Sequence, residues 1–210
     1  MYGELGGSSK SKLDLVKGLI GSMIDDWPKE IQLGLLAYGH RGRRAPGGNR
    51  CRDIELLVPV ASDTASTVRR RVLGLSAKGS TPLCLALEQA RDHLKAETTP
   101  GNLVLISNGT EECGGDLLET VSMLASDGSQ LAVDVLSLGQ IRVQNAPLEE
   151  LTRLTEGRLF DVRNEADAKT AMEAIVQRLV KRGNLSVTVH DLCGNDRLTE
   201  TPLSWELCGV

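Results

Sequence analysis

Strand-like and helix-like segments alternate along most of this chain, and that alternation limits the possible folds more than any other feature. Apolar residues at helical spacing fill 12–26, and a mostly apolar run typical of a buried strand follows at 31–38. We expect further strands at 53–58, 103–107, 131–138 and 158–162, and further helices at about 62–75, 82–95, 116–126, 146–156 and 165–181. Such alternation is typical of parallel βαβ units, so the sequence predicts an α/β fold with a three-layer, doubly wound, mostly parallel sheet.

Two of these strands show how the sheet is expected to be covered. Residues 103–107 are almost wholly apolar, which is typical of a strand with helices on both faces. In the segment 31–38, Leu33 and Leu35 fall on one face and Leu36 and Tyr38 on the other. Pro59 ends the next strand pattern and marks it as a strand at the sheet edge, or as a strand terminus.

The pattern changes after Gly183. Residues 185–190 and 203–207 alternate with period two around a turn at 194–196, which predicts a β-hairpin. A lone hairpin is too small to be stable by itself, so we interpret 183–210 as the start of a further β-domain and 1–182 as the α/β domain.

Composition excludes several function classes. The 210 residues carry a net charge of -4, and the cationic run Arg69–Arg71 lies on a helical pattern where an exposed face explains it. Only 2% of residues are aromatic, so base-stacking platforms are lacking and nucleic acid is not an expected partner. No apolar run reaches the roughly 20 residues that a membrane span needs.

Five sequence blocks, in this order, resemble a bacterial branch of the von Willebrand factor type A (vWA) domain. They are KLDLVK at 12–17, LGLLAYGHR at 33–41, CRDIELLVP at 51–59, GSTPL at 79–83 and LISNGTEECGGD at 105–116. The resemblance covers roughly residues 1–180. It implies a protein-binding, adhesion-type module without catalytic activity.

Domains of that family usually bind Mg²⁺ at a metal-ion-dependent adhesion site (MIDAS), built from an Asp-x-Ser-x-Ser motif, a Thr and an Asp. Such a hard cation prefers an octahedral shell of oxygen ligands. Thr81 matches the Thr, but Asn108 stands where the Asp would be, and Met1-Tyr2-Gly3 resembles the residues directly after the missing Asp-x-Ser-x-Ser. The resemblance therefore implies a degenerate site that holds no cofactor in this chain, whereas a full-length parent could hold Mg²⁺ or Ca²⁺. Thr81 could instead cap the helix that begins at Pro82.

The resemblance also implies that the first strand of the family, which is central in its 3-2-1-4-5-6 sheet, is missing. The strands 31–38 and 103–107 would then lose backbone partners, at about 1–3 kcal/mol for each buried unpaired group. We expect another segment to fill the gap. The candidates are a preceding segment of a parent protein, or residues 185–190, acting within one chain or exchanged between two chains of a dimer.

The five cysteines give a second set of expectations. The resembling branch often carries both Cys51 and Cys113, which implies a disulfide between them and an extracytoplasmic (periplasmic or secreted) location. Cys193 and Cys208 flank the expected hairpin and could form a second bridge, whereas Cys84 is expected to be a buried free thiol. Small apolar packing residues are the alternative for all five.

The loops at the carboxyl ends of the strands are where a doubly wound fold presents its ligands. We expect contacts to an unknown protein partner from His40, Arg41, Ser80, Thr81, Asn108, Glu111, Glu112 and Asp116. One alternative is a regulatory subunit of an ATP-driven chelatase or remodelling complex, which a cytoplasmic location and reduced cysteines would favour. The other is an α/β hydrolase, but the chain has neither a Gly-x-Ser-x-Gly nucleophile motif nor a phosphate-binding loop motif.

Overall fold

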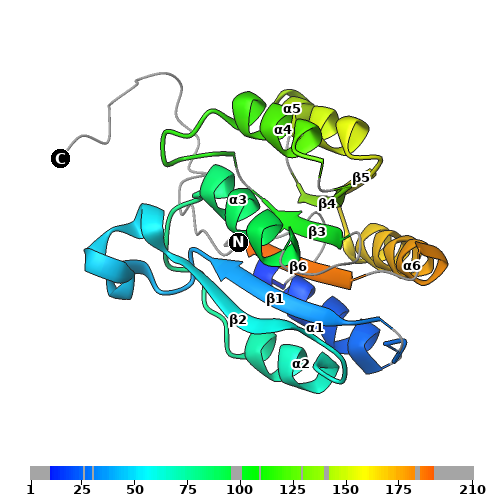
Figure 1. Ribbon diagram of the computed structural model, residues 1–210. Helices are drawn as coiled ribbons and strands as arrows, with labels where there is room; N and C mark the ends of the chain where they lie inside the picture. The colour runs from blue at the N-terminus through cyan, green and yellow to red at the C-terminus, as the bar shows by residue number, and fades with distance from the viewer. Residues whose placement is uncertain are drawn as a thin grey trace.

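One six-stranded sheet forms the middle layer of the molecule (Figure 1). The computed structural model describes residues 10–25, 27–29, 31–95, 101–108, 110–128, 130–139, 142–182 and 185–191. The strands are β1 (Leu33–Tyr38), β2 (Ile54–Ala61), β3 (Gly101–Ser107), β4 (Ala132–Leu138), β5 (Leu159–Val162) and β6 (Leu185–Asp191). Their order is β2-β1-β6-β3-β4-β5, with β2 antiparallel at one edge and every other pairing parallel.

Helices cover both faces of the sheet, as the alternating sequence pattern predicts. One core places the sheet against α1 (Lys12–Asp25), α2 (Ala65–Leu73) and α6 (Glu165–Arg182). The other core places it against α3 (Leu83–Lys95), α4 (Leu117–Ser126) and α5 (Arg142–Leu154). The predicted three-layer α/β fold is therefore confirmed. None of the helices among the described residues is long and apolar enough to cross a membrane.

Alternate residues of each central strand supply the two cores. Leu103 and Leu105 of β3 pack with α3, α4 and α5, whereas Val104 and Ile106 pack with the helices on the opposite face. All four side chains are buried, and burying an aliphatic side chain of this size stabilises a fold by about 1.5–3 kcal/mol. The aliphatic residues of these strands thus account for a core with very few aromatic side chains.

The edge strand β2 runs through Pro59 to Ala61 rather than ending before it. Proline cannot donate a ladder hydrogen bond, and an edge strand is the position where a sheet tolerates that loss. Pro59 is exposed, and among the strands of the described residues β2 pairs only with β1. The edge position predicted from Pro59 is confirmed.

Strand β6 occupies the central position for which the sequence offers no early strand. It pairs in parallel with β1, from Leu33 opposite Ser186 to Tyr38 opposite Asp191. On its other side it pairs in parallel with β3, beginning with Gly101 opposite Leu185. Of the candidates named for this position, residues 185–190 of the same chain fill it in this structure.

The position of β6 corrects the domain boundary predicted at residue 183. Both edges of β6 are paired within the sheet, so residues 185–191 belong to the α/β domain and not to an appended unit. The second strand expected at 203–207, the turn at 194–196, and the candidate disulfide between Cys193 and Cys208 lie outside the described residues.

Candidate functional site

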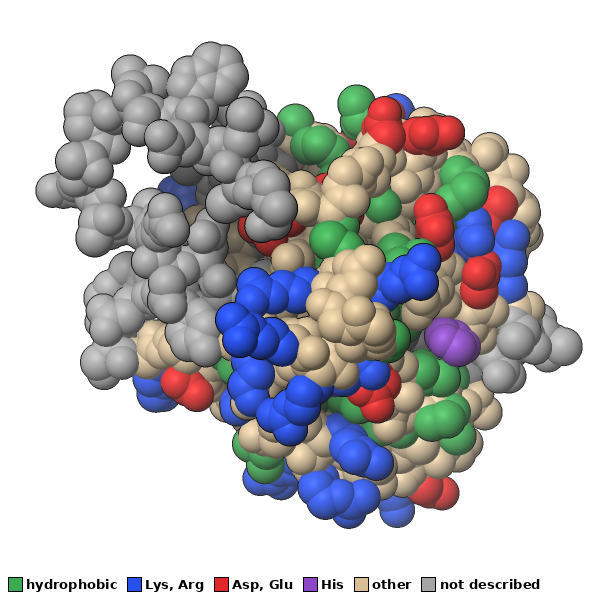
Figure 2. All heavy atoms as spheres, turned by 90° about the vertical axis from the view of Figure 1, so that its left-hand side faces the viewer, with side chains coloured by type: hydrophobic (Ala, Val, Ile, Leu, Met, Phe, Trp, Pro, Cys, Tyr) green, Lys and Arg blue, Asp and Glu red, His purple; other side chains and the backbone are tan. Residues whose placement is uncertain are grey.

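The carboxyl ends of β1, β6 and β3 meet at one edge of the sheet, on the left in Figure 1. The loop 39–53 follows β1, the loop 108–116 follows β3, and residues 74–82 lead into α3. Three short 3₁₀ turns, η1 (Gly42–Arg44), η2 (Pro46–Gly48) and η3 (Arg50–Arg52), shape the first loop. We call these three segments together the carboxyl-edge surface, and Figure 2 looks onto it.

Asp53 holds the first loop in place. Its carboxylate is fully buried and accepts hydrogen bonds from the backbone N–H groups of Arg41 and Gly42, both at 2.8 Å. The Arg41 Nε also donates to Asp53, at 2.8 Å, and an Arg41 terminal nitrogen donates to the Ile54 carbonyl at 2.8 Å. A buried carboxylate is tolerated when it is paired and hydrogen-bonded in this way. Arg41, predicted as a partner contact, is thus mainly used within the loop.

His40 is also turned inward. Its side chain is 9% exposed, with Nε2 3.1 Å from a Glu55 carboxylate oxygen and Nδ1 3.7 Å from Asp53. Burial lowers the pKa of His40 below its ordinary value of 6.5, and the two carboxylates oppose this shift only in part. Because the ring is buried and neutral at physiological pH, His40 offers a partner little contact surface.

The loop after β1 and the segment before α3 are joined backbone to backbone. The N–H groups of Lys78 and Gly79 both donate to the Gly39 carbonyl, at 2.9 and 2.8 Å. A Cβ atom on Gly79 would lie 2.6 Å from the Gly39 Cα atom, which is too close for any side chain. Gly42, at φ +59°, likewise has the Lys78 carbonyl oxygen 2.6 Å from a would-be Cβ atom. Only glycine permits this approach of the two segments.

The acidic pair Glu111-Glu112 joins the third loop to the same surface. The Glu111 carboxylate accepts from the backbone N–H groups of Cys84, at 2.8 Å, and Cys113, at 2.6 Å, and so caps the start of α3. The Glu112 carboxylate accepts from the Thr81 N–H at 3.2 Å, and the Glu112 N–H donates to the Thr81 carbonyl at 3.0 Å. Both acidic residues, predicted as partner contacts, have internal roles that the sequence alone did not reveal.

The other predicted contact residues differ in their exposure. Asp116 is exposed and forms the N-cap of α4, accepting from the N–H groups of Leu118 and Glu119 at 2.9 and 3.1 Å. Ser80 and Asn108 are half-buried, next to Thr81 and directly after β3 respectively. Thr81 itself is only 1% exposed.

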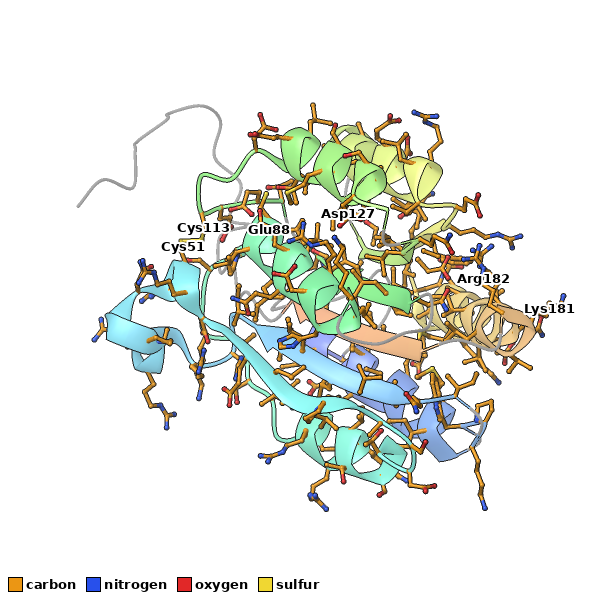
Figure 3. All side chains as sticks on the ribbon, in the orientation of Figure 1. Cys51, Glu88, Cys113, Asp127, Lys181 and Arg182 are labelled. Atoms are coloured by element: carbon orange, nitrogen blue, oxygen red, sulfur yellow. A yellow bond between two sulfur atoms is a disulfide. The ribbon has the colours of Figure 1, made fainter. Side chains whose placement is uncertain are left out.

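A disulfide joins two of the three loops. Cys51 and Cys113 are bonded, with an S–S distance of 2.02 Å across 62 residues of sequence (Figure 3), which confirms this predicted pair. Beside it lies a pocket of about 310 Å³ between η3, the start of α3 and the loop 111–115. Cys84 lines this pocket as a buried free thiol, also as predicted, and burial raises its pKa to about 11. A thiol with that pKa is nearly all protonated near neutral pH and is a poor nucleophile.

The described side chains do not fit a Mg²⁺ site of the MIDAS kind. The Thr81 hydroxyl is buried and has no hydrogen-bond partner among the described residues. A hydroxyl that serves as a metal ligand would look the same when no ion is present. However, the described part of the chain holds no cluster of three or more His, Cys, Asp or Glu side chains suited to a metal. Asn108 supplies a neutral amide where the family has a carboxylate. The hydroxyl is thus in place, but the charged ligands are not.

Comparison with proteins of known sequence gives one distant relative. No family model matches the chain. The sequence is 23% identical over 174 residues to the uncharacterized protein YwmD of Bacillus subtilis, and this match spans 81% of the chain and 78% of YwmD.

Solved structures give a more specific likeness. BatB from Bacteroides thetaiotaomicron superimposes with a TM-score of 0.61 at 17% identity, over 85% of this chain and 91% of BatB. A von Willebrand factor type A protein from Catenulispora acidiphila gives 0.63 at 15% identity, over 79% of this chain and 37% of that one. Proximal thread matrix protein 1 of the mussel byssus, in a form with zinc in its MIDAS motif, gives 0.55 at 11% identity, over 78% of this chain and 42% of that one. Together with the strand order and the two helical layers, these matches show that the chain has the fold of a vWA domain.

Proposed function

We propose that this chain is a protein-binding module of the adhesion type that binds its partner through the carboxyl-edge surface. The observation that carries the proposal is that three separate loops are fastened into one surface. The Cys51–Cys113 bond ties loop 39–53 to loop 108–116, and the N–H groups of Lys78 and Gly79 tie residues 74–82 to the Gly39 carbonyl. The Glu111-Glu112 pair ties loop 108–116 to Thr81 and to the start of α3. A surface ordered in advance loses less conformational entropy on binding, which favours affinity.

We propose further that binding needs neither catalysis nor a metal ion. The residues that a hydrolase would use are committed elsewhere, since Cys113 is in a disulfide and the Glu111 carboxylate accepts two backbone hydrogen bonds. A partner carboxylate that completes a Mg²⁺ shell would need charged ligands in place of Asn108. We therefore regard the site as a degenerate MIDAS whose binding comes from the surrounding loops.

An extracytoplasmic location is part of the same proposal. Structural disulfides persist in oxidising compartments and are rare in the cytosol. The Cys51–Cys113 bond thus supports a periplasmic or secreted module. It argues against the alternative of a regulatory subunit in a cytoplasmic ATP-driven chelatase or remodelling complex, for which reduced cysteines were expected.

Site-specific photo-crosslinking tests the proposal. A photoreactive phenylalanine analogue is placed at Ser80 or Thr110 on the carboxyl-edge surface, and at Gln177 or Lys181 near the carboxyl end of α6 as matched controls. We expect one discrete protein adduct in the native extracytoplasmic fraction from Ser80 and Thr110, unchanged by a metal chelator, and none from the controls. Equal labelling from all four positions, or loss of the adduct with chelator, would contradict the proposal.

A further inference from the structure

The loop after β1 carries five arginines in a chain whose net charge is negative. They are Arg41, Arg43, Arg44, Arg50 and Arg52, and residues 39–52 contain no acidic residue. Arg41 is paired with Asp53 and Glu55. The other four are exposed and make no ion pair with any residue that the structure describes. We call residues 42–52 the arginine loop.

The arginine loop is fixed at both of its ends. At its start, Gly42 binds the buried Asp53 carboxylate through its N–H and packs directly against the Lys78 backbone. At its end, Cys51 is bonded to Cys113, and the Asn49 side chain accepts a hydrogen bond from the Cys51 N–H at 2.9 Å. The loop thus presents its four free guanidinium groups from an ordered backbone, and their positions are set before any partner arrives.

Positive charge extends from this loop over the neighbouring surface. Lys78, whose backbone contacts Gly42, is exposed, as are Arg70 and Arg71 in the last turn of α2. Figure 2 shows Lys and Arg side chains gathered on the side of the molecule that carries the loop, with few acidic side chains between them. Because the whole chain has a net charge of -4, the rest of the chain is correspondingly acidic, and this charge separation orients an approaching anionic partner.

The chemistry of the loop selects among anionic partners. Guanidinium groups bind carboxylates through paired, charge-assisted hydrogen bonds. Nucleic-acid grooves add aromatic side chains on which bases stack, and peripheral membrane sites add aromatic or aliphatic side chains that enter the lipid. Residues 39–52 contain no aromatic side chain and no large aliphatic one.

We propose that the arginine loop docks a segment of the partner protein that is rich in Asp and Glu. This inference rests on the proposed function and adds the chemistry of the partner. The four free arginines would each face carboxylates of an extended acidic segment lying across the η1–η3 turns. Lys78 would contribute charge at the margin of this contact.

Binding of a defined acidic peptide tests this inference. The oxidised full chain is titrated with a fluorescent twelve-residue Glu-rich peptide, with the matching Gln-rich peptide as a blank, at low and at physiological salt. We expect the double variants Arg43→Gln/Arg44→Gln and Arg50→Gln/Arg52→Gln each to weaken binding about tenfold, equivalent to about 1.4 kcal/mol. The control Arg158→Gln/Lys181→Gln removes the same charge from exposed residues outside the arginine loop and should change binding less than twofold.

Three results would overturn the inference that the arginine loop docks an acidic segment. They are no binding of the Glu-rich peptide, an equal loss of binding in the control variant, and tighter binding of single-stranded DNA or phosphatidylserine vesicles than of the peptide.

The crosslinking experiment separates this inference from the proposed function. If the four arginine substitutions leave the Ser80 adduct at full yield, the arginine inference fails and the protein-binding proposal stands. If the peptide binds as expected but Ser80 and Thr110 give no adduct, the proposed function fails.

Discussion

Single buried polar side chains determine how the loops at the carboxyl edge are held. Asp53 has no exposed surface, yet it lies directly before a strand in the sequence, where an acidic residue usually faces solvent. Its hydrogen bonds to the backbone of Arg41 and Gly42 fix the start of the arginine loop. The stability of that loop therefore depends on a side chain that has no exposed surface.

Replacing the Asp53 carboxylate should destabilise the folded protein. In Asp53→Asn the half-buried Arg41 guanidinium loses its fully buried charged partner, and we expect the free energy of unfolding to fall by about 3 kcal/mol. Urea unfolding measures this change. Glu55→Gln removes the more exposed partner of Arg41 and should cost less than about 1 kcal/mol. Equal losses of unfolding free energy in the two variants would contradict the claim that the burial of Asp53 makes its carboxylate important for stability.

His40 should make stability depend on pH in a predictable direction. Burial lowers the folded-state pKa of His40 below its unfolded value of 6.5, so below that pH the unfolded chain takes up a proton that the folded chain resists. The His40 contribution is thus fully present above pH 6.5 and is lost as the pH falls through the folded pKa. Urea unfolding between pH 7.5 and 5 should show a shallower decline in His40→Gln than in the parent chain. Parallel curves for the two proteins would contradict the assignment.

At the scale of elements, the three loops behave as one unit because they are tied to each other and to the start of α3. The Cys51–Cys113 bond closes a long segment that includes β2, α2, α3 and β3. The Glu111 carboxylate meanwhile fastens the loop after β3 to the first turn of α3. A substitution that loosens one loop should therefore also destabilise the other two.

Removing the disulfide should destabilise the fold by about 2–4 kcal/mol, because a long chain segment becomes unconstrained in the unfolded state. The variant Cys51→Ala/Cys113→Ala, compared with the parent chain in urea, gives this value. Cys84→Ala is the matched control, since that thiol is free, and its unfolding should remain sensitive to reductant. A parent chain whose stability is unaffected by reductant would contradict a structural role for the bond.

The sequence pattern predicts the strands and helices well because long apolar periodicities report burial directly. The run at 103–107 and the two faces of 31–38 were assigned correctly on that basis. The pattern does not distinguish a polar side chain that faces a partner from one that caps a helix, because both lie in loops with the same composition. Glu111, Glu112 and Asp116 were expected at the binding surface for this reason, although each accepts backbone hydrogen bonds within the domain.

At the scale of the whole molecule, the parallel sheet is continuous because its last described strand lies at its centre. Alternation with period two suggested a hairpin for 185–190, since periodicity carries no information about which strand is the neighbour. Residues 185–191 instead lie between β1 and β3, because both strands would otherwise leave buried backbone groups unpaired. With β6 in that position, the carboxyl ends of β1 and β3 lie at a fixed separation. Because the loops of the carboxyl-edge surface follow these strand ends, the position of β6 also sets the positions of the loops.

Hydrogen–deuterium exchange of the intact, oxidised chain tests this arrangement most directly. If β6 is the central strand, the amides of residues 34–38, 102–107 and 186–190 should exchange slowly and become exposed together, with one common free energy of opening. Rapid exchange in 186–190 while 34–38 and 102–107 stay protected would contradict the account. The carboxyl-edge surface would then need another support.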